Sequence, residues 1–285
     1  MNNAAPTPSR GPQPVVREIT CKSVLNKCSI GDYSLNCYVG CAHGCAYCYA
    51  RYMQRFHPHA EPWGEFVDVK TNAVEVLEKQ VRRMAPSSVF MSSACDGWQP
   101  LEQTWRLTRE CCRILIEHGF RVNALTKNAL VLRDLDILAR GSARLAVTIT
   151  TPDEGLAALW EPCASSVAER WQILSRAREA GIETGVMFGP LLPFLSDGEA
   201  SLDALFEAAA REQVDVIWVD ALNPRPKVWE SVGALLRSEF PDLEERYRRV
   251  LFAPVVRKAY IKALGEWVRR AAAKHGVLER LAGCP

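Results

Sequence analysis

Residues 40–49 read GCAHGCAYCY and hold three of the eleven cysteines of the chain. Its three cysteines, Cys41, Cys45 and Cys48, follow a C-x3-C-x2-C spacing. Three thiolates on one loop can hold three irons of a [4Fe–4S] cluster. The fourth iron is then left open for a ligand from outside the protein. We therefore predict that these three cysteines are the metal ligands of the chain.

The open iron predicts the second cofactor, because it can chelate the amino and carboxylate groups of S-adenosylmethionine (SAM). Electron transfer to the sulfonium then cleaves the C5′–S bond and makes a 5′-deoxyadenosyl radical, which abstracts hydrogen from a substrate. Gly40 and Gly44 permit the tight backbone that wraps such a cluster. A zinc knuckle also uses closely spaced cysteines, but Cys111, Cys112 and Cys163 supply no second pair at zinc-like spacing. A non-enzymatic iron–sulfur or zinc protein is the alternative.

The composition is that of a globular protein in a reducing compartment. The chain has 285 residues, of which 48% are hydrophobic and 24% charged, and this excludes disorder of the whole chain. It has no apolar run of about eighteen residues that would predict a membrane span. Residues 1–16 lack the apolar core of a signal peptide. We expect a cytoplasmic protein, in which eleven cysteines indicate a metal or redox centre rather than disulfides.

Strand-like apolar runs alternate with helical patterns from residue 17 to residue 222. Ser166 and Glu169 form a capping-box pattern that opens a helix ending before Gly181. The expected strands are residues 34–39, 88–94, 121–125, 145–150, 183–188 and 214–219, and the expected helices include residues 74–84, 104–118, 131–139 and 202–210.

Repeated βα units of this kind imply a parallel sheet with right-handed crossovers. The predicted fold class is α/β, a partial (β/α)6 TIM-like barrel over residues 17–222. A disordered tail is expected at residues 1–16. A helical C-terminal extension is expected at residues 223–285, with Pro241 and Pro254 as breaks.

Several stretches beyond the cysteines resemble one family. The sequence resembles the radical SAM superfamily and, within it, the spore photoproduct lyase-like, or DNA repair photolyase-like, group. The resemblance implies a radical SAM barrel, cleavage of SAM and an electron donor of the flavodoxin or ferredoxin type. It favours a lyase that repairs a DNA lesion. The matching stretches are residues 22–27, 40–51, 63–67 with 70, 92–96, 99–102, 126–127 with 133–134, 161–162 with 170, and 181–193.

The resemblance also assigns catalytic roles outside the cysteine loop. In spore photoproduct lyase a cysteine after the second barrel strand donates a hydrogen atom to the product radical, and Cys95 stands at the matching place. A thiol suits that task because its S–H bond is weak. Tyr47 and Tyr49 match tyrosines near the cofactor, one of which is proposed to relay a hydrogen atom, and we assign the relay to Tyr47. The alternatives are aromatic packing for Tyr47 and a small buried thiol for Cys95.

Four more residues are predicted to contact SAM, because ligands bind at the carboxyl ends of strands in α/β barrels. Asp96 and Glu102 follow the second strand, Lys127 follows the third, and Thr148 lies on the fourth. The Gly-Gly-Glu triplet that many superfamily members place after the second strand is absent here, and Asp96 is predicted to take its place.

The substrate stays open at the level of the sequence. Residues 241–285 carry ten Lys and Arg against five Asp and Glu, with Tyr247, Tyr260 and Trp267 among them. Such a segment can touch phosphates, although a solvated helix face has the same composition. A radical enzyme acting on a peptide, an RNA or a small metabolite is therefore the alternative. Cys21, Cys28 and Cys37 are either a second redox site or separate thiols, and Cys284 has no assigned role.

Overall fold

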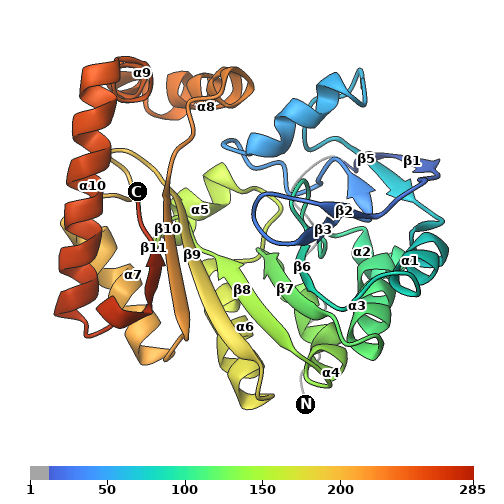
Figure 1. The fold of residues 1–285 in the computed structure, drawn as a ribbon. Helices are drawn as coiled ribbons and strands as arrows, with labels where there is room; N and C mark the ends of the chain where they lie inside the picture. Colours follow the sequence, from blue (N-terminus) through green and yellow to red (C-terminus); the bar gives the residue numbers. More distant parts are fainter. Residues whose placement is uncertain (1–12) are drawn as a thin grey trace, which may run out of the picture.

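The structure is a computed structural model that describes residues 13–285. Its centre is a run of parallel strands that lie side by side in chain order, as Figure 1 shows. These strands are β3 (Tyr33–Leu35), β6 (Ser88–Met91), β7 (Arg121–Thr126), β8 (Ala143–Thr148), β9 (Glu183–Leu191) and β10 (Val216–Ala221). The sheet does not close on itself in the described part of the chain, so the predicted α/β fold with a partial barrel is confirmed.

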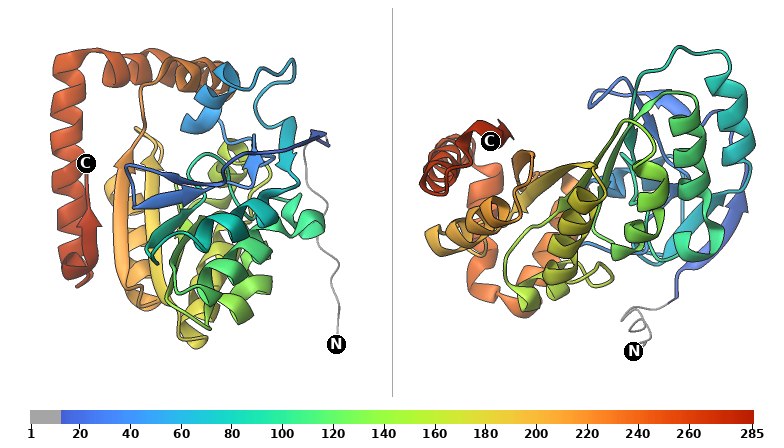
Figure 2. Two further views of the ribbon diagram at one scale, coloured as in Figure 1. Left: turned by 45° about the vertical axis from the view of Figure 1, so that its right-hand side comes forward. Right: turned by 90° about the horizontal axis from the view of Figure 1, so that it is seen from below.

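Helices follow each strand and cover the outer face of the sheet (Figure 2). The helix after β5 buries Ala73, Leu77 and Val81, which are four residues apart and therefore share one face. The helices of the barrel are α1 (Ala73–Val81), α2 (Glu102–Trp105), α3 (Leu107–Glu117), η2 (Ala129–Asp134), α4 (Leu135–Leu138), α5 (Glu154–Trp160), α6 (Val167–Glu179) and α7 (Glu199–Arg211), where η marks a 3₁₀ helix.

The predicted boundaries of α6 are confirmed in detail. Ser166 accepts from the backbone N–H of Glu169, and the Glu169 carboxylate accepts from the N–H of Ser166, which completes the capping box. The chain leaves the helix through Gly181, whose φ of +74° is readily adopted by glycine alone.

The strand predicted over residues 34–39 is wrong as one element. The structure divides it into β3 and β4 (Tyr38–Val39), which belong to different sheets. β4 pairs with β5 (Phe66–Lys70), and β5 pairs with β1 (Val15–Ile19), in a small sheet of three strands within residues 13–285. β1 begins at Val15, inside the tail predicted for residues 1–16, of which residues 1–12 lie outside the described part. β2 (Leu25–Lys27) forms a hairpin with β3 at one edge of the main sheet.

The C-terminal extension is helical, as predicted, except at its end. It contains α8 (Pro226–Glu239), η3 (Pro241–Leu243), α9 (Glu244–Phe252), α10 (Pro254–Lys274) and η4 (Leu278–Arg280). Pro241 and Pro254 stand at the first positions of their helices, where the missing N–H costs no hydrogen bond. β11 (Leu281–Gly283), which we did not predict, then pairs in parallel with β10.

The extension packs directly on the loop that carries the cysteines. One hydrophobic cluster contains Cys45 and Tyr47 of that loop together with Val232 of α8 and Tyr247 of α9. The loop and the extension therefore share a core. Among the described residues, none of the helices combines the length and the apolar character that a membrane crossing needs.

Candidate active site

The cysteine loop leaves β4 at Gly40 and enters η1 (Tyr49–Arg55) after Cys48. Both of its glycines have positive φ, +87° at Gly40 and +63° at Gly44. A Cβ on Gly40 would lie 2.5 Å from the carbonyl oxygen of Phe66, and one on Gly64 would lie 2.8 Å from the Cα of Gly44. The loop therefore wraps tightly against its neighbours, which confirms the expectation drawn from its glycines.

The three loop cysteines are held as thiols by burial, and two buried N–H donors lie beside one of them. Burial raises the pKa of Cys41, Cys45 and Cys48, that of Cys45 to about 12. Nε of Arg51 and Nε1 of Trp63 are buried N–H donors without a hydrogen-bond acceptor in residues 13–285, and both groups favour the thiolate of Cys48. An iron–sulfur cluster supplies sulfur acceptors and holds thiolates, so this donor set fits it.

A [4Fe–4S] cluster binds each thiolate at a different iron, so its ligands do not converge on one point. Within residues 13–285, no three His, Cys, Asp or Glu side chains form a group that could hold a single metal ion. Ligation by Cys41, Cys45 and Cys48 therefore stays a prediction that the loop geometry supports.

Tyr47 points away from the loop into a buried polar network beside β8. Its hydroxyl donates to Glu161 and lies 3.0 Å from Oγ1 of Thr150. Glu161 also pairs with Arg170, and each of these two side chains is 1% exposed. The Tyr47 ring stacks on Trp160 with a centroid distance of 6.5 Å. Both the ring and the hydroxyl are thus held in place, and the relay role of Tyr47 stays a prediction.

Cys95 follows β6 and lies against the cysteine loop. It packs in one hydrophobic cluster with Cys41, Cys48 and Trp63. Burial and, after it, the neighbouring Cys37 raise the pKa of Cys95 to about 12. The thiol is therefore protonated at neutral pH and carries the hydrogen that its predicted role requires.

Asn36 holds the Cys95 segment in place, although the sequence gave us no reason to select it. Its Oδ1 accepts from the N–H of Ala94 at 2.8 Å and from Sγ of Cys95 at 3.7 Å, while its Nδ2 donates to Oγ of Ser93 at 3.1 Å. Nζ of Lys70 donates to the carbonyl of Asn36 at 2.8 Å. One amide thus fixes three successive residues at the end of β6.

Asp96 binds neighbouring loops through both of its oxygens. Oδ1 accepts from the hydroxyl of Thr126 and the N–H of Trp98, and Oδ2 accepts from the N–H of Lys127 and lies 3.4 Å from Nδ1 of His43. Burial alone would raise the pKa of Asp96, but His43 and these hydrogen bonds lower it to about 2. The carboxylate therefore joins the cysteine loop to the ends of β6 and β7, and direct contact with SAM stays a prediction.

Glu102 lies in a buried network of hydrogen-bond donors. Its side chain is 0% exposed and accepts from Tyr38, from the backbone N–H groups of Thr108 and Arg109, and from Arg133 at 3.0 Å. The carboxylate therefore anchors the start of α3, and its contact with SAM stays a prediction.

The remaining predicted contacts lie around the opening of the barrel. Nζ of Lys127 is 5.7 Å from the centroid of the Tyr47 ring, and its charge lowers the pKa of Cys45 against the larger effect of burial. Thr148 is buried at the end of β8, where its carbonyl accepts from Arg170. Tyr49 is 44% exposed, and its hydroxyl donates to the carbonyl of Ser93.

The other cysteines that we singled out do not form one site. Sγ of Cys37 lies 3.7 Å from Sγ of Cys111 in the core. Cys28 instead contacts the carbonyl of Gly31 in the turn of the β2–β3 hairpin. Cys284, which follows β11, contacts the carbonyl of Gly265 of α10.

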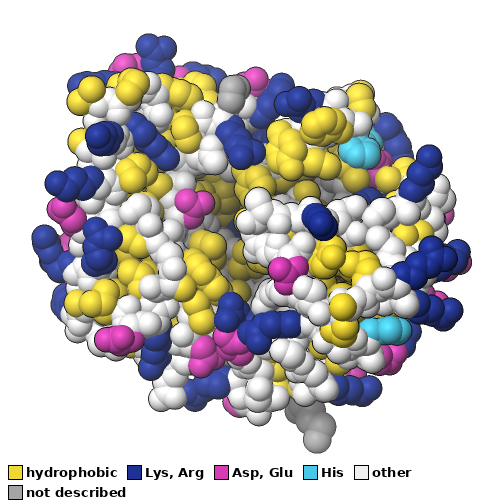
Figure 3. Space-filling view, in the orientation of Figure 1, with side chains coloured by type: hydrophobic (Ala, Val, Ile, Leu, Met, Phe, Trp, Pro, Cys, Tyr) yellow, Lys and Arg dark blue, Asp and Glu magenta, His cyan; other side chains and the backbone are white. Residues whose placement is uncertain are grey.

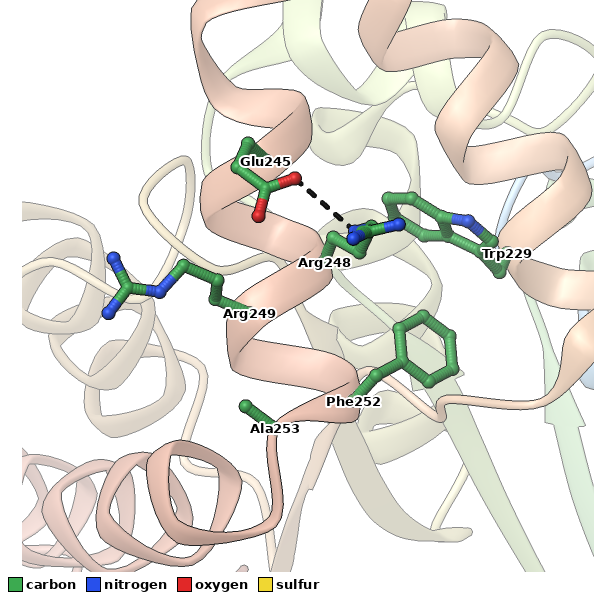
Figure 4. A pocket seen from close by; sticks show the side chains of 6 residues that line it. All are labelled: Trp229, Glu245, Arg248, Arg249, Phe252 and Ala253. Atoms are coloured by element: carbon green, nitrogen blue, oxygen red, sulfur yellow. Dashed lines mark ion pairs between the residues drawn. The ribbon is translucent and has the colours of Figure 1, made fainter.

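Figure 3 shows a hollow in the face between the C-terminal extension and the cysteine loop, with hydrophobic side chains in it. A separate groove of about 470 Å³ lies between α8 and α9 and is drawn in Figure 4. It is lined by Trp229, Glu245, Arg248, Arg249, Phe252 and Ala253. None of these is a predicted site residue, so the groove is not part of the candidate active site.

Residues 35–205 match the family model of the radical SAM superfamily, over more than half of the chain. This chain belongs to the radical SAM superfamily. Radical SAM proteins use a [4Fe–4S] cluster together with SAM, so both predicted cofactors are confirmed at the level of the family. An uncharacterised protein of Mycobacterium tuberculosis is 30% identical over 282 residues, which cover 93% of this radical SAM chain and 81% of that protein. An uncharacterised protein of Methanocaldococcus jannaschii is 31% identical over 185 residues, which cover 64% and 70% of the two chains.

Solved structures of spore photoproduct lyase have the same fold as this radical SAM protein. A mutant with bound AdoMet and dinucleoside spore photoproduct superimposes with a TM-score of 0.71 at 16% identity, over 91% of this chain and 79% of that one. A second structure, complexed with dinucleoside spore photoproduct, gives a TM-score of 0.70 at 15% identity over the same shares. The fold expected from the sequence resemblance is therefore confirmed.

Proposed function

We propose that this radical SAM enzyme is a lyase that repairs a DNA lesion by splitting a thymine adduct. The observation that carries the proposal is the place of Cys95. Its thiol packs against the cluster loop beside Cys41, and the amide of Asn36 holds it there. A protonated thiol at this place can return a hydrogen atom to a product radical.

The side chains around the opening have distinct tasks in this proposal. When bound, the cluster and SAM supply a radical that abstracts hydrogen from the substrate. Lys127 carries a positive charge beside Tyr47, which suits the carboxylate of SAM. Asn36 orients Cys95, and Asp96 keeps the loops that carry His43 and Lys127 together.

Two further features support a nucleic-acid substrate. The fold is similar over most of the chain to spore photoproduct lyases whose structures contain a dinucleoside spore photoproduct. The segment after residue 240 also has an excess of positive charge, which suits a phosphate backbone.

The test uses anaerobically reconstituted enzyme with SAM and dithionite, with and without an oligonucleotide that carries the thymine adduct. We expect 5′-deoxyadenosine to form and the adduct to revert to two thymines, while an undamaged oligonucleotide stays unchanged. If 5′-deoxyadenosine forms and the adduct persists, the lesion proposal is wrong and the substrate belongs to the alternative classes of peptide, RNA or small metabolite. If none forms with a full cluster, the assignment of the cofactor site is wrong.

A further inference from the structure

The segment directly after the cluster loop forms a positively charged, aromatic surface. Residues 49–60 contain two arginines and two histidines but no Asp or Glu. Arg55 is exposed, and Phe56 is 60% exposed. Figure 3 shows hydrophobic side chains gathered over η1, with Lys or Arg side chains and a histidine around them.

Cations and rings alternate across this surface. The guanidinium of Arg55 lies 4.8 Å from the ring centroid of Phe56, and Tyr52 meets Phe56 edge to face at 6.4 Å. Arg225, which precedes α8, lies 5.7 Å from the ring of Tyr52 and 5.9 Å from the ring of Tyr49. We call the surface made by Tyr52, Arg55, Phe56 and Arg225 the η1 face.

The charges of the η1 face are available to a partner. In residues 13–285, no carboxylate lies within 4.0 Å of the guanidinium of Arg55 or Arg225. The neighbouring Lys227, by contrast, pairs with Glu230 at 3.2 Å. The guanidinium groups of the two arginines lie near aromatic rings instead, and these contacts do not neutralise their charge.

The η1 face also follows the predicted cluster ligands directly along the chain. Cys48 immediately precedes η1. Arg51, within η1, donates from Nη2 to the carbonyl of Cys45 at 3.0 Å. A partner seated on η1 is therefore separated from the cluster loop by little more than this one 3₁₀ helix.

We propose that the η1 face is the docking surface for an acidic one-electron carrier protein of the flavodoxin or ferredoxin type. Radical SAM chemistry needs one electron per cleavage, and neither SAM nor the residues described here supply it. In the docked pair the reduced carrier loses one electron and the iron–sulfur group gains it, with no bond formed or broken. The exposed rings supply apolar contact, and the unpaired arginines attract acidic side chains of the carrier.

A nucleic acid is the other class of partner that such a surface suits. The carrier is favoured by two features of the chain. The predicted hydrogen donor Cys95 packs against Cys41 and Cys48 of the cysteine loop, and Lys127 lies beside Tyr47 of the same loop. Arg55 and Phe56 instead lie exposed at the C-terminal end of η1. The positively charged segment that suits DNA lies elsewhere, after residue 240.

The binding test compares Arg55→Glu and Phe56→Ala with Lys258→Glu, a control that makes the same charge change on exposed α10. Calorimetry with reconstituted enzyme and a reduced flavodoxin at low salt measures affinity without any turnover. We expect Arg55→Glu to weaken binding about tenfold, Phe56→Ala about threefold and the control less than about twofold. The Arg55→Glu difference should shrink as salt rises, because it is electrostatic. Equal affinity of Arg55→Glu and the wild type at low salt overturns the proposal.

The turnover test compares two reductants and rests on the family chemistry, not on the lesion substrate. With flavodoxin as the reductant, Arg55→Glu should form 5′-deoxyadenosine about tenfold more slowly at limiting carrier concentration. With dithionite, which needs no docking surface, its rate should equal that of the wild type. Equal slowing with both reductants, together with weaker binding to DNA, would assign the η1 face to the nucleic acid instead. A wild type inactive with dithionite would count against the proposed function and leave the calorimetric test intact.

Discussion

Tyr47 belongs to the cysteine loop and Cys95 packs against it, but their polar groups have very different hydrogen-bond partners. The Cys95 thiol has one weak acceptor at 3.7 Å, the amide oxygen of Asn36. The Tyr47 hydroxyl instead donates to a carboxylate that is itself paired with buried Arg170. A group that must release a hydrogen atom benefits from a weak hydrogen-bond partner, so the comparison favours Cys95 as the hydrogen donor. The strong hydrogen bond of Tyr47 suits an anchoring role instead.

The largest effect on activity is expected for Cys45→Ala, because Cys45 is one of the three predicted cluster ligands on the loop between Cys95 and the Tyr47 network. We expect loss of the visible absorbance near 400 nm after anaerobic reconstitution and no 5′-deoxyadenosine formation, because two thiols hold a cluster poorly. Cys284→Ala is the matched control and should keep both signals, since Cys284 lies against α10. An unchanged spectrum of Cys45→Ala would contradict the assignment of the cluster ligands.

The next largest effect, on deuterium labelling of the product, distinguishes Cys95 from Tyr47 directly. In D2O, a thiol that exchanges with solvent delivers deuterium to the product, so Cys95→Ala should abolish this label while 5′-deoxyadenosine still forms. Tyr47→Phe should retain the label if Tyr47 is structural and lose it if Tyr47 relays the hydrogen. Cys28→Ala, a thiol in the β2–β3 turn, is the control and should behave as the wild type. Unchanged labelling in Cys95→Ala would remove Cys95 from the mechanism.

A smaller effect, on stability, is expected on the Tyr47 side. Glu161→Gln leaves the buried guanidinium of Arg170 without its counter-charge, which costs about 3 kcal/mol of unfolding free energy. Glu179→Gln removes an exposed partner of Arg176 and should cost less than about 0.5 kcal/mol. The measurement is the urea midpoint of each variant, and equal midpoints would mean that the Tyr47 network is not a stabilising anchor.

The smallest effect is a pH dependence on the Cys95 side. The pKa of Asp96 is lowered from 3.8 to about 2 in the folded protein, so its ionised form stabilises the fold at pH values above about 4. This contribution, about 2 kcal/mol, is lost as the pH falls from about 4 towards 2. Asp96→Asn should lose that part of the acid dependence, while an Asp242→Asn control, at an exposed position of η3, keeps it. Parallel acid curves for the wild type and Asp96→Asn would contradict the lowered pKa.

The sequence predicts best what depends on local spacing. The capping box of Ser166 and Glu169 and the alternation of strands and helices both act within short windows, and the structure follows them. The C-x3-C-x2-C motif is equally local, and its family is confirmed by the match of residues 35–205. Asn36 could not be found in this way, because its contacts with residues 93–95 exist only once β3 pairs with β6.

Two further features depend on contacts that spacing cannot show. Glu102 follows the end of the second barrel strand, and its buried contacts with Arg133 and Tyr38 exist only once α2 has turned it inward. β11 has three residues, too few for any periodicity, and its pairing with β10 depends on α10 returning the chain to the sheet edge.

The core that the cysteine loop shares with the C-terminal extension bears on the order of biosynthesis. Cys45 and Tyr47 leave the ribosome early, whereas Val232, Leu236 and Tyr247, which cover them, are made much later. During that interval the loop lacks its covering side chains and stays open to water. The cover of the cysteine loop is therefore complete only after α8 and α9 have been made.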